Sequence, residues 1–491
     1  MKYIIGSLIL TILFSASPNK AKYRKQPNII VVLLDDLGYD TAVLGDSITN
    51  IEGGARSIDM PTLRGKLTNE GLVLDNAFAS PTCTPSRVQL MTGKYLYESH
   101  HQFGYLNWNA RTLAQELLWN GYKTAIAGKW QLHGNNSFTS VSAYDEDYQI
   151  TNFDNPKRLG YSQFLLHSIN GNNNRYSFCD RYFFDNGLLA CGQNDYGPDI
   201  VYDYFEDFIV ANKDSNRPFF FDYRMNLPHD PFEPPPGTNA YPNDTVNNAM
   251  HLPDMLSYAD SIIANIVSLI DSTSELHEGA GTVLLVLSDN GSSRGWINNN
   301  PGGDPMLMWG IFTKIIGVGE FNGGKSRSTY LGCHIPGFVY YVGPHKKYTN
   351  GSHYQAPFGL IDVYATVLDL AKLSHLKNED GVSIADEIVN YVDSVPDRET
   401  LFQYYNPHWP AQEQIRGGTN INSFVTDGDY WLDSYGRFYD IVDSMDWELI
   451  IPLDTLESQA QTDAYAKLDS ALSLKPYAQE FNKPLIETIP N

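Results

Sequence analysis

Short, almost wholly apolar runs alternate along this chain with amphipathic patterns of helical period, and no other feature restricts the possible folds as strongly. The apolar runs have the length of β-strands and lie at 28–34, 123–127, 218–223, 282–287 and 335–342. The helical patterns lie at 61–71, 112–120, 199–211, 253–271 and 359–373. Buried strands that alternate with helices predict an α/β fold, a large and mostly parallel sheet sandwiched by helices.

Polar residues with reactive or ligating side chains follow four of the predicted strands. They are Asp35, Asp36, Lys129, His229, Asp289 and Asn290. In an open α/β sheet, ligands bind beyond the carboxyl ends of the strands. These side chains are therefore expected to lie together at one edge of the sheet.

The four acidic and amide residues of this group, Asp35, Asp36, Asp289 and Asn290, offer only oxygen ligands. Alone, an Asp-Asp pair is typical of a turn or a helix cap, and Asp-Asn-Gly is typical of a turn. Two such pairs at the same edge of one sheet favour a metal site instead. Oxygen-only ligation suits Ca²⁺ or Mg²⁺ rather than zinc.

Cys83 directly precedes a pattern that predicts a helix. Thr84 suits the capping position, Pro85 the first helical position, and Gly93 the residue that ends the helix. A helix N-terminus favours an anion, and Arg87 adds a cation on the first turn. The simpler alternative is a buried, inert cysteine. The surrounding polar residues favour a nucleophile that acts on an anionic group.

Three cations accompany Cys83: Lys129, His229 and Lys325, the last in a Gly-Gly-Lys-Ser loop. A lone lysine is usually solvated, and a lone histidine is usually structural. Together the three would surround a bound anion and offer a proton donor for a leaving alcohol.

The overall charge excludes some functions. The chain carries 34 Lys and Arg against 57 Asp and Glu, a net charge of −23. Such a field repels nucleic acid and anionic membrane surfaces, so neither is an expected partner. An anionic substrate would have to be attracted by a local basic pocket.

The N-terminus has the pattern of a secretory signal peptide, assigned to residues 1–20. Lys2 precedes an apolar run at 3–14, and small residues follow at 15–17. The run is too short to span a bilayer. We therefore expect a secreted or periplasmic protein that has no membrane association after signal cleavage.

Two further segments carry specific expectations. Residues 135–197 are rich in Asn, Tyr and Ser with little periodicity, and are interpreted as a long insertion of loops. Within them, Cys179 and Cys191 either form a disulfide or remain two free thiols. Near the end of the chain, short antiparallel strands are predicted at 421–425, 430–433 and 437–441. The predicted domains are 27–385, which is catalytic, and 386–491, a small C-terminal α+β subdomain with an antiparallel sheet.

The motifs resemble those of a known family. Cys83-Thr84-Pro85-Ser86-Arg87 resembles the Cys-X-Pro-Ser-Arg signature of type I, formylglycine-dependent sulfatases, and residues 121–129 resemble their second signature. The other polar motifs follow in family order, and the resemblance covers 27–452. It implies an arylsulfatase-like member of the alkaline phosphatase superfamily, with the fold of that superfamily.

The resemblance also implies roles for the site residues. A maturation enzyme would convert Cys83 to formylglycine, whose hydrate is the nucleophile. Ca²⁺ would be bound by Asp35, Asp36, Asp289, Asn290 and the modified residue 83. Arg87 would position the hydrate. Sulfate oxygens would be bound by Lys129, Lys325 and His229, and His229 or Lys325 would protonate the leaving group.

One position departs from the family pattern. The family reads Gly-Lys-Trp-His-Leu-Gly, whereas this chain reads Gly-Lys-Trp-Gln-Leu-His-Gly. Either Gln131 takes the place of the family histidine and His133 lines the substrate pocket, or a local bulge lets His133 take that role.

We expect an enzyme that hydrolyses a sulfate ester, with a sulfated carbohydrate as the substrate. Two other hypotheses remain open. One is a phosphonate or phosphate ester hydrolase of the same fold. The other is a degenerate protein that binds sulfated glycans without cleaving them, for which Gln131 is the only support.

Overall fold

The structure is a computed structural model that describes much of the chain between residues 25 and 475. The described residues are 25–50, 55–99, 104–106, 109–130, 132, 155–167, 182–184, 188–190, 195–238, 249–293, 311–315, 319–375, 379–394, 398–405, 422–434, 436–441, 456 and 458–475. Several predictions concern residues outside these ranges and stay predictions. They are the signal peptide at 1–20, the pairing of Cys179 with Cys191, and the roles of Gln131 and His133.

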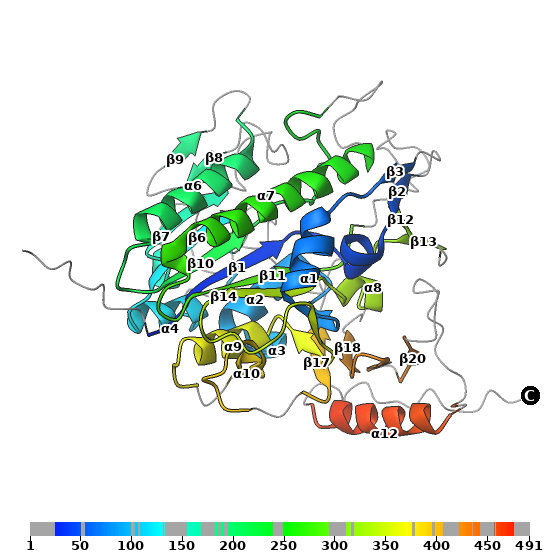
Figure 1. The fold of residues 1–491 in the computed structure, drawn as a ribbon. Coiled ribbons are helices and arrows are strands. Elements are labelled where there is room, and N and C mark those ends of the chain that lie inside the picture. The colour runs from blue at the N-terminus through cyan, green and yellow to red at the C-terminus, as the bar shows by residue number, and fades with distance from the viewer. Residues whose placement is uncertain are drawn as a thin grey trace, which may run out of the picture.

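A ten-stranded sheet forms the centre of the fold (Figure 1). In spatial order its strands are β15 (Ser352–Tyr354), β4 (Leu72–Leu74), β14 (Gly337–Val342), β11 (Thr282–Ser288), β1 (Asn28–Leu34), β10 (Phe219–Arg224), β6 (Lys123–Lys129), β7 (Gln163–His167), β8 (Tyr182–Phe184) and β9 (Leu188–Ala190). From β11 to β7 all neighbours are parallel. The prediction of a large, mostly parallel sheet is confirmed.

Strand β14, predicted at 335–342, pairs antiparallel with β11. Its first residue, Gly337, lies opposite Leu287 near the end of β11. Between the two strands the chain forms β12 (Ile311–Ile315), β13 (Gly319–Asn322) and α8 (Tyr330–Cys333). Among the described residues, this connection contains no helix that returns the chain to the opposite edge of the sheet. Strand β14 therefore starts at the edge where β11 ends, and the two strands run antiparallel.

Helices cover both faces of the sheet, and alternate residues of β1 contact the two layers. Ile29, Val31 and Leu33 pack with α2 (Cys83–Thr92), α4 (Leu113–Trp119) and α9 (Asp362–Leu370). Ile30, Val32 and Leu34 pack with α6 (Gly197–Asn212) and α7 (Leu252–Ser272), which lie together across the other face (Figure 1). Because β1 is buried on both faces, it reads as a continuous apolar run.

Shorter helices complete the described fold. They are α1 (Thr68–Glu70), α3 (Leu96–Ser99), α5 (Asn155–Arg158) and α10 (Ala385–Ile388), with π-helical turns at Asp40–Leu44 and Thr62–Leu67. The second π-helical turn continues into α1, and together they account for the helix predicted at 61–71. Among the helices of the described residues, none combines the length and the apolar character needed to cross a membrane.

The interpretation of 135–197 as loops throughout is wrong where the segment is described. Strand β7 extends the parallel core beside β6, and β8 and β9 add two more strands. The sequence Gln-Phe-Leu-Leu-His of β7 contains only three consecutive apolar residues. A run this short gives no clear periodicity, and pairing with β6 decides its conformation.

A four-stranded antiparallel sheet lies near the C-terminus, as predicted. Its strands are β17 (Leu401–Tyr405), β18 (Asn422–Thr426), β19 (Tyr430–Asp433) and β20 (Phe438–Asp440). Its first strand, β17, was not anticipated from the sequence. Helix α12 (Gln459–Ser473) packs its buried residues Ala464, Leu468 and Leu472 into the same apolar cluster. Smaller sheets join β13, β12, β2 (Ser47–Asn50) and β3 (Ala55–Ser57), and β16 (Phe358–Gly359) with β5 (Ala77–Phe78).

A buried histidine, His334, lies between α8 and β14. Its Nε2 is 2.8 Å from the Asp75 carbonyl oxygen, and its ring stacks on Tyr39 with centroids 4.3 Å apart. Burial lowers the pKa of His334 from 6.5 to about 4, although the bond to Asp75 raises it. The unfolded chain therefore binds this proton at a higher pH than the folded chain.

This difference predicts a pH-dependent stability. The contribution of neutral His334 to the free energy of unfolding is complete above pH 6.5 and is lost as the pH falls towards 4. The loss should reach about 3 kcal/mol. The His334→Gln variant lacks this titrating group. As the pH falls from 6.5 towards 4, the free energy of unfolding should therefore fall more steeply for the wild type than for the variant. Urea denaturation at each pH measures the free energy of unfolding of both proteins. If the two free energies change with pH in parallel, the prediction is wrong.

Candidate active site

The carboxyl ends of β1 and β11 bring the two predicted acidic pairs together. The strands are in parallel register, with Leu34 opposite Ser288. The Asp36 backbone N–H donates to Asp289 Oδ1 at 3.1 Å, and Asn290 Nδ2 donates to Asp36 Oδ1 at 2.8 Å. The expectation that these residues share one sheet edge therefore agrees with the geometry.

The loop after β1 is held in an unusual backbone conformation. Asp36 has φ +64°, in the left-handed region that Asp and Asn tolerate better than most residues. The next two backbone N–H groups, of Leu37 and Gly38, donate to the hydroxyls of Ser288 and Ser292 at 3.1 and 2.9 Å. These bonds hold the backbone of the loop that follows Asp36.

Arg87 joins the Cys83 helix to the acidic residues. Its side chain is fully buried, and Nη2 donates to Asp289 Oδ2 at 2.7 Å. The same nitrogen is 3.6 Å from Asp35 Oδ1, and Nη1 lies 3.4 Å from the Lys129 carbonyl oxygen. Burial lowers the pKa of Arg87, but Asp289 and Asp35 outweigh it and hold the pKa above its usual value. The guanidinium is therefore a fixed cation.

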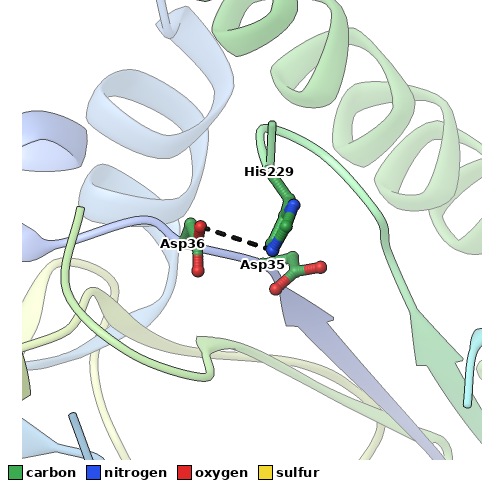
Figure 2. A group of neighbouring side chains, drawn as sticks. All are labelled: Asp35, Asp36 and His229. Carbon is green, nitrogen blue, oxygen red and sulfur yellow. Dashed lines mark ion pairs between the residues drawn. The ribbon is translucent and has the colours of Figure 1, made fainter. Parts of the chain in front are cut away.

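The remaining predicted cations also contact carboxylates. Lys129 Nζ lies 2.5 Å from Asp35 Oδ2, and Lys325 Nζ lies 2.5 Å from Asp36 Oδ2. His229 Nε2 is 3.0 Å from Lys325 Nζ and 3.7 Å from Asp36 Oδ2 (Figure 2). Three carboxylates and the side chains of Arg87, Lys129 and Lys325 thus lie together in a mostly buried cluster.

Cys83 is the first residue of α2 rather than the residue before it. Thr82, with an extended backbone, occupies the N-cap position, so the prediction that Thr84 caps the helix is wrong. Pro85 lies in the first turn, where its missing N–H costs no helical hydrogen bond. Gly93 ends the helix in the left-handed conformation, as predicted.

The Cys83 thiol is buried, at 3% exposure. Burial raises its pKa above the ordinary value, and the nearby Lys129 and Lys325 lower it without cancelling the effect. A raised pKa keeps the group neutral, which disfavours a thiolate nucleophile. This electrostatic setting agrees with a cysteine that does not itself react as a thiol.

The carboxylates differ in their pKa values. Burial raises the pKa of Asp35, but Lys129 and His229 outweigh burial and hold it below its usual range. For Asp289, burial and the neighbouring Asp35 raise the pKa to about 6, against the lowering effect of Arg87. Of these two carboxylates, Asp289 is therefore the one whose negative charge the neighbouring cations stabilise less.

Two buried oxygens of the cluster could bind a cation. Asp35 Oδ1 and Asn290 Oδ1 have no hydrogen-bond partner among the described residues. Ligand atoms of Asp35, Asp36 and His229 all lie within 4.8 Å of one another (Figure 2). Buried oxygens without a donor are costly unless a cation or water satisfies them. The carboxylate and amide donors suit a hard divalent cation.

The sequence did not single out His167, which ends β7 directly opposite Lys129 in the parallel register of β6 and β7. Its side chain is buried at 7% exposure. A short apolar run that ends in a histidine could have indicated this residue, because polar residues also follow the apolar runs of the other predicted strands.

Gly128, before Lys129, allows β6 and β10 to approach closely. Its φ is +103°, and a Cβ would lie 1.9 Å from the Arg224 carbonyl oxygen. We expect Gly128→Ala to destabilise the protein by about 3 kcal/mol or more, because the backbone of β6 or β10 would have to move to make room for the Cβ. Gly121→Ala is the control. Gly121 also has a positive φ, +94°, but an added Cβ would meet no atom within 4 Å. Urea unfolding should show a clearly smaller loss for the control; equal losses would contradict this account.

Comparison with known proteins assigns the family. The profile of the family described as Sulfatase matches residues 27–373. The chain belongs to the sulfatase family, as its motifs indicated. Together with the named sulfatase relatives, the match indicates a sulfuric ester hydrolase.

Two curated relatives illustrate the similarity. The chain is 27% identical to mouse arylsulfatase J over 289 residues, which are 54% of this chain but only 43% of that protein. It is 25% identical to an N-acetylgalactosamine-6-O-sulfatase of Bacteroides thetaiotaomicron, over 71% of this chain and 73% of the relative.

Solved structures share the fold. The structure of BT4656 in complex with its substrate D-glucosamine-2-N,6-O-disulfate matches with a TM-score of 0.64 and 17% identity, covering 94% of this chain and all of that one. The phosphonate monoester hydrolase of Agrobacterium radiobacter matches with a TM-score of 0.59 and 13% identity, covering 91% and 95%. The sheet and its helices therefore have the alkaline phosphatase-like sulfatase fold.

Proposed function

We propose that this protein hydrolyses sulfate esters on a sulfated carbohydrate, using a formylglycine made from Cys83 and a bound Ca²⁺. The observation that carries the proposal is the mostly buried cluster of carboxylates and cations at the sheet edge, close to Cys83 at the start of α2. Family membership and the sulfated-sugar specificities named for the relatives support the substrate class.

The setting of Cys83 supports modification rather than thiol chemistry. Its raised pKa leaves little thiolate. A serine that attacked a sulfate ester would itself become a stable sulfate ester. A hydrated aldehyde can attack with one hydroxyl and then expel sulfate through the other, which restores the carbonyl. Arg87, on the next turn of α2, would position the hydrate.

The acidic residues would hold the cation. Asp35, Asp36, Asp289 and Asn290 are the proposed ligands, together with residue 83. Asp35 Oδ1 and Asn290 Oδ1 are buried and accept no hydrogen bond among the described residues, which supports this assignment. A bound Ca²⁺ would supply Lewis-acid polarisation of a sulfate oxygen.

The cations of the cluster would bind the substrate anion. Lys129 and Lys325 carry charges next to the carboxylates, and His229 contacts Lys325. These groups would stabilise the negative charge on the sulfate oxygens. His229 or Lys325 would donate a proton to the leaving sugar oxygen, a step typically worth about 10²–10⁴-fold.

Two measurements test the proposal. Mass analysis of the peptide containing Cys83, from protein made in its native host, should show the loss expected for conversion of thiol to aldehyde. The purified protein should release sulfate from defined sulfated oligosaccharides. An unmodified Cys83 in an active protein would overturn the mechanism.

A second candidate keeps the nucleophile and changes the ester. The likeness to a phosphonate monoester hydrolase shows that the fold accommodates this chemistry in another protein. Rates on an aryl sulfate and a matched aryl phosphonate separate the two candidates. A clear preference for phosphonate would favour the second.

A further inference from the structure

The segment that leads into α2 is held by backbone hydrogen bonds to two other parts of the chain. The Ala79 N–H donates to the Cys333 carbonyl oxygen at 2.8 Å, and the Ser326 N–H donates to the Pro81 carbonyl oxygen at 2.7 Å. Ser326 directly follows Lys325, one of the cations of the cluster. The entry to α2 is therefore attached to α8 and to the loop that carries this lysine.

Ser80, in the same segment, bonds to α2 twice. Its carbonyl oxygen accepts from the Ser86 hydroxyl at 3.1 Å, and its own hydroxyl donates to Gln89 Oε1 at 3.1 Å. Ser86 lies in the first turn of α2, and Gln89 lies further along the helix. Because Ser80 is three residues before Cys83, these two bonds hold the residues that lead to Cys83 against the helix.

Gln89 extends this series of hydrogen bonds to the C-terminal sheet. Its Nε2 donates to Gln403 Oε1 of β17 at 2.9 Å. Gln89 is fully buried, and Ser80 and Gln403 are each 1% exposed. Because the three side chains have almost no contact with water, a bond lost here is not replaced by a bond to solvent.

Arg87 holds the other side of α2. It donates to Asp289 Oδ2 at 2.7 Å, within the proposed metal site. Successive helical residues lie about 100° apart around the axis, so Arg87 and Gln89 project from nearly opposite sides of α2. Their hydrogen bonds therefore oppose rotation of the helix, which would move residue 83 relative to Asp289.

We propose that Gln89 is a positioning residue for the nucleophile: its amide joins Ser80 to Gln403, and so fixes the turn that carries residue 83 to the C-terminal sheet. Displacing a reacting group by about 1 Å can slow a reaction about 10²-fold. This inference rests on the proposed function, and it adds a requirement for the C-terminal sheet in forming the active site.

The first test is Gln89→Met, which keeps the length of the side chain and a similar helix propensity but removes both hydrogen bonds. We expect kcat to fall about tenfold with KM within about twofold, because the nucleophile is displaced while the cations that bind sulfate stay in place. The mass of the Cys83 peptide gives the fraction converted to aldehyde, and kcat is expressed per converted protein. Altered maturation is thereby distinguished from altered positioning.

Thr92→Val is the matched control. Thr92 is buried on the same helix, and its hydroxyl donates to the Val88 carbonyl oxygen at 2.7 Å. The substitution removes a buried hydrogen bond that lies within α2, so kcat should stay near the wild-type value. Wild-type kcat in Gln89→Met, or an equal loss of kcat in Thr92→Val, would overturn the proposal.

Coupling between Ser80 and Gln403 provides the second readout. Ser80→Ala and Gln403→Met each break one of the two bonds of Gln89. Both should lower kcat, and the double variant should lose less than the product of the two single effects, because the two residues are joined through Gln89. In the Gln89→Met background, neither substitution should lower kcat by more than about a further twofold. Independent effects that multiply in the wild-type background would overturn the proposal.

Failure of the proposed function is recognised separately, from a wild-type protein that releases no sulfate from sulfated oligosaccharides. Amide hydrogen exchange over residues 79–87 then tests the positioning without a substrate. Exchange in this segment should be at least about threefold faster in Gln89→Met and Gln403→Met, and unchanged in Thr92→Val. Wild-type exchange in Gln403→Met would overturn the link between the C-terminal sheet and residue 83.

Discussion

Replacing Cys83 with alanine is expected to lower kcat for sulfate-ester hydrolysis by about 10⁴-fold or more. The variant has no side chain that can become an aldehyde, and therefore no nucleophile. Residue 83 also contributes to the proposed Ca²⁺ site, so its loss removes a ligand at the same time. Steady-state release of sulfate, at saturating substrate, measures the effect.

The fold should survive this change. Alanine suits the first turn of a helix, and the loss of one buried sulfur costs about 1 kcal/mol. Cys333→Ala is the matched control, because Cys333 is likewise a buried cysteine outside any disulfide, with a pKa raised by burial. The control should keep most of the wild-type kcat. A Cys83→Ala variant with substantial turnover would contradict the assigned nucleophile.

Replacing Asp36 with asparagine is expected to lower kcat/KM by about 10³-fold, through loss of the cation and of the charge that holds Lys325. Asparagine tolerates the left-handed backbone at this position, so the loop should keep its conformation. The substitution removes the negative charge that pairs with Lys325 at 2.5 Å. Calorimetric titration with Ca²⁺ should show binding to the wild type and much weaker binding to the variant.

Chelation gives the complementary result. Wild-type protein treated with a chelator should lose activity and regain it when Ca²⁺ is added, whereas Ca²⁺ should not restore Asp36→Asn. Asp254→Asn is the control, because it breaks a partly exposed ion pair with Arg56 away from the cluster. If chelation leaves the wild type fully active, the assigned metal site is wrong.

The agreement between sequence and structure is closest at the ends of β1 and β11. Asp35, Asp36, Asp289 and Asn290 were expected together because parallel strands present their carboxyl ends at one edge. The hydrogen bonds of Asp36 with Asp289 and Asn290 agree with that expectation. Lys129, at the end of β6, joins them through Asp35 for the same reason.

The agreement is weaker where tertiary contacts override local pattern. The predicted start of α2 was too late in the chain, because Thr84 and Pro85 suit the first positions of a helix. In the structure the N-cap is Thr82. Strand β7 was missed because three apolar residues carry no readable period. His167, which ends this strand opposite Lys129, was missed with it.

The chemistry available to this protein can be read from local sequence: a cysteine at a helix start, oxygen ligands after two strands, and cations after others. It also determined the parallel core, since apolar runs and helical patterns depend on residues a few positions apart. Tertiary packing sets which cation faces which carboxylate, how deeply Cys83 is buried, and the contact of β17 with α2 through Gln403 and Gln89. These contacts join segments far apart in the chain, and local pattern carries no information about such pairs.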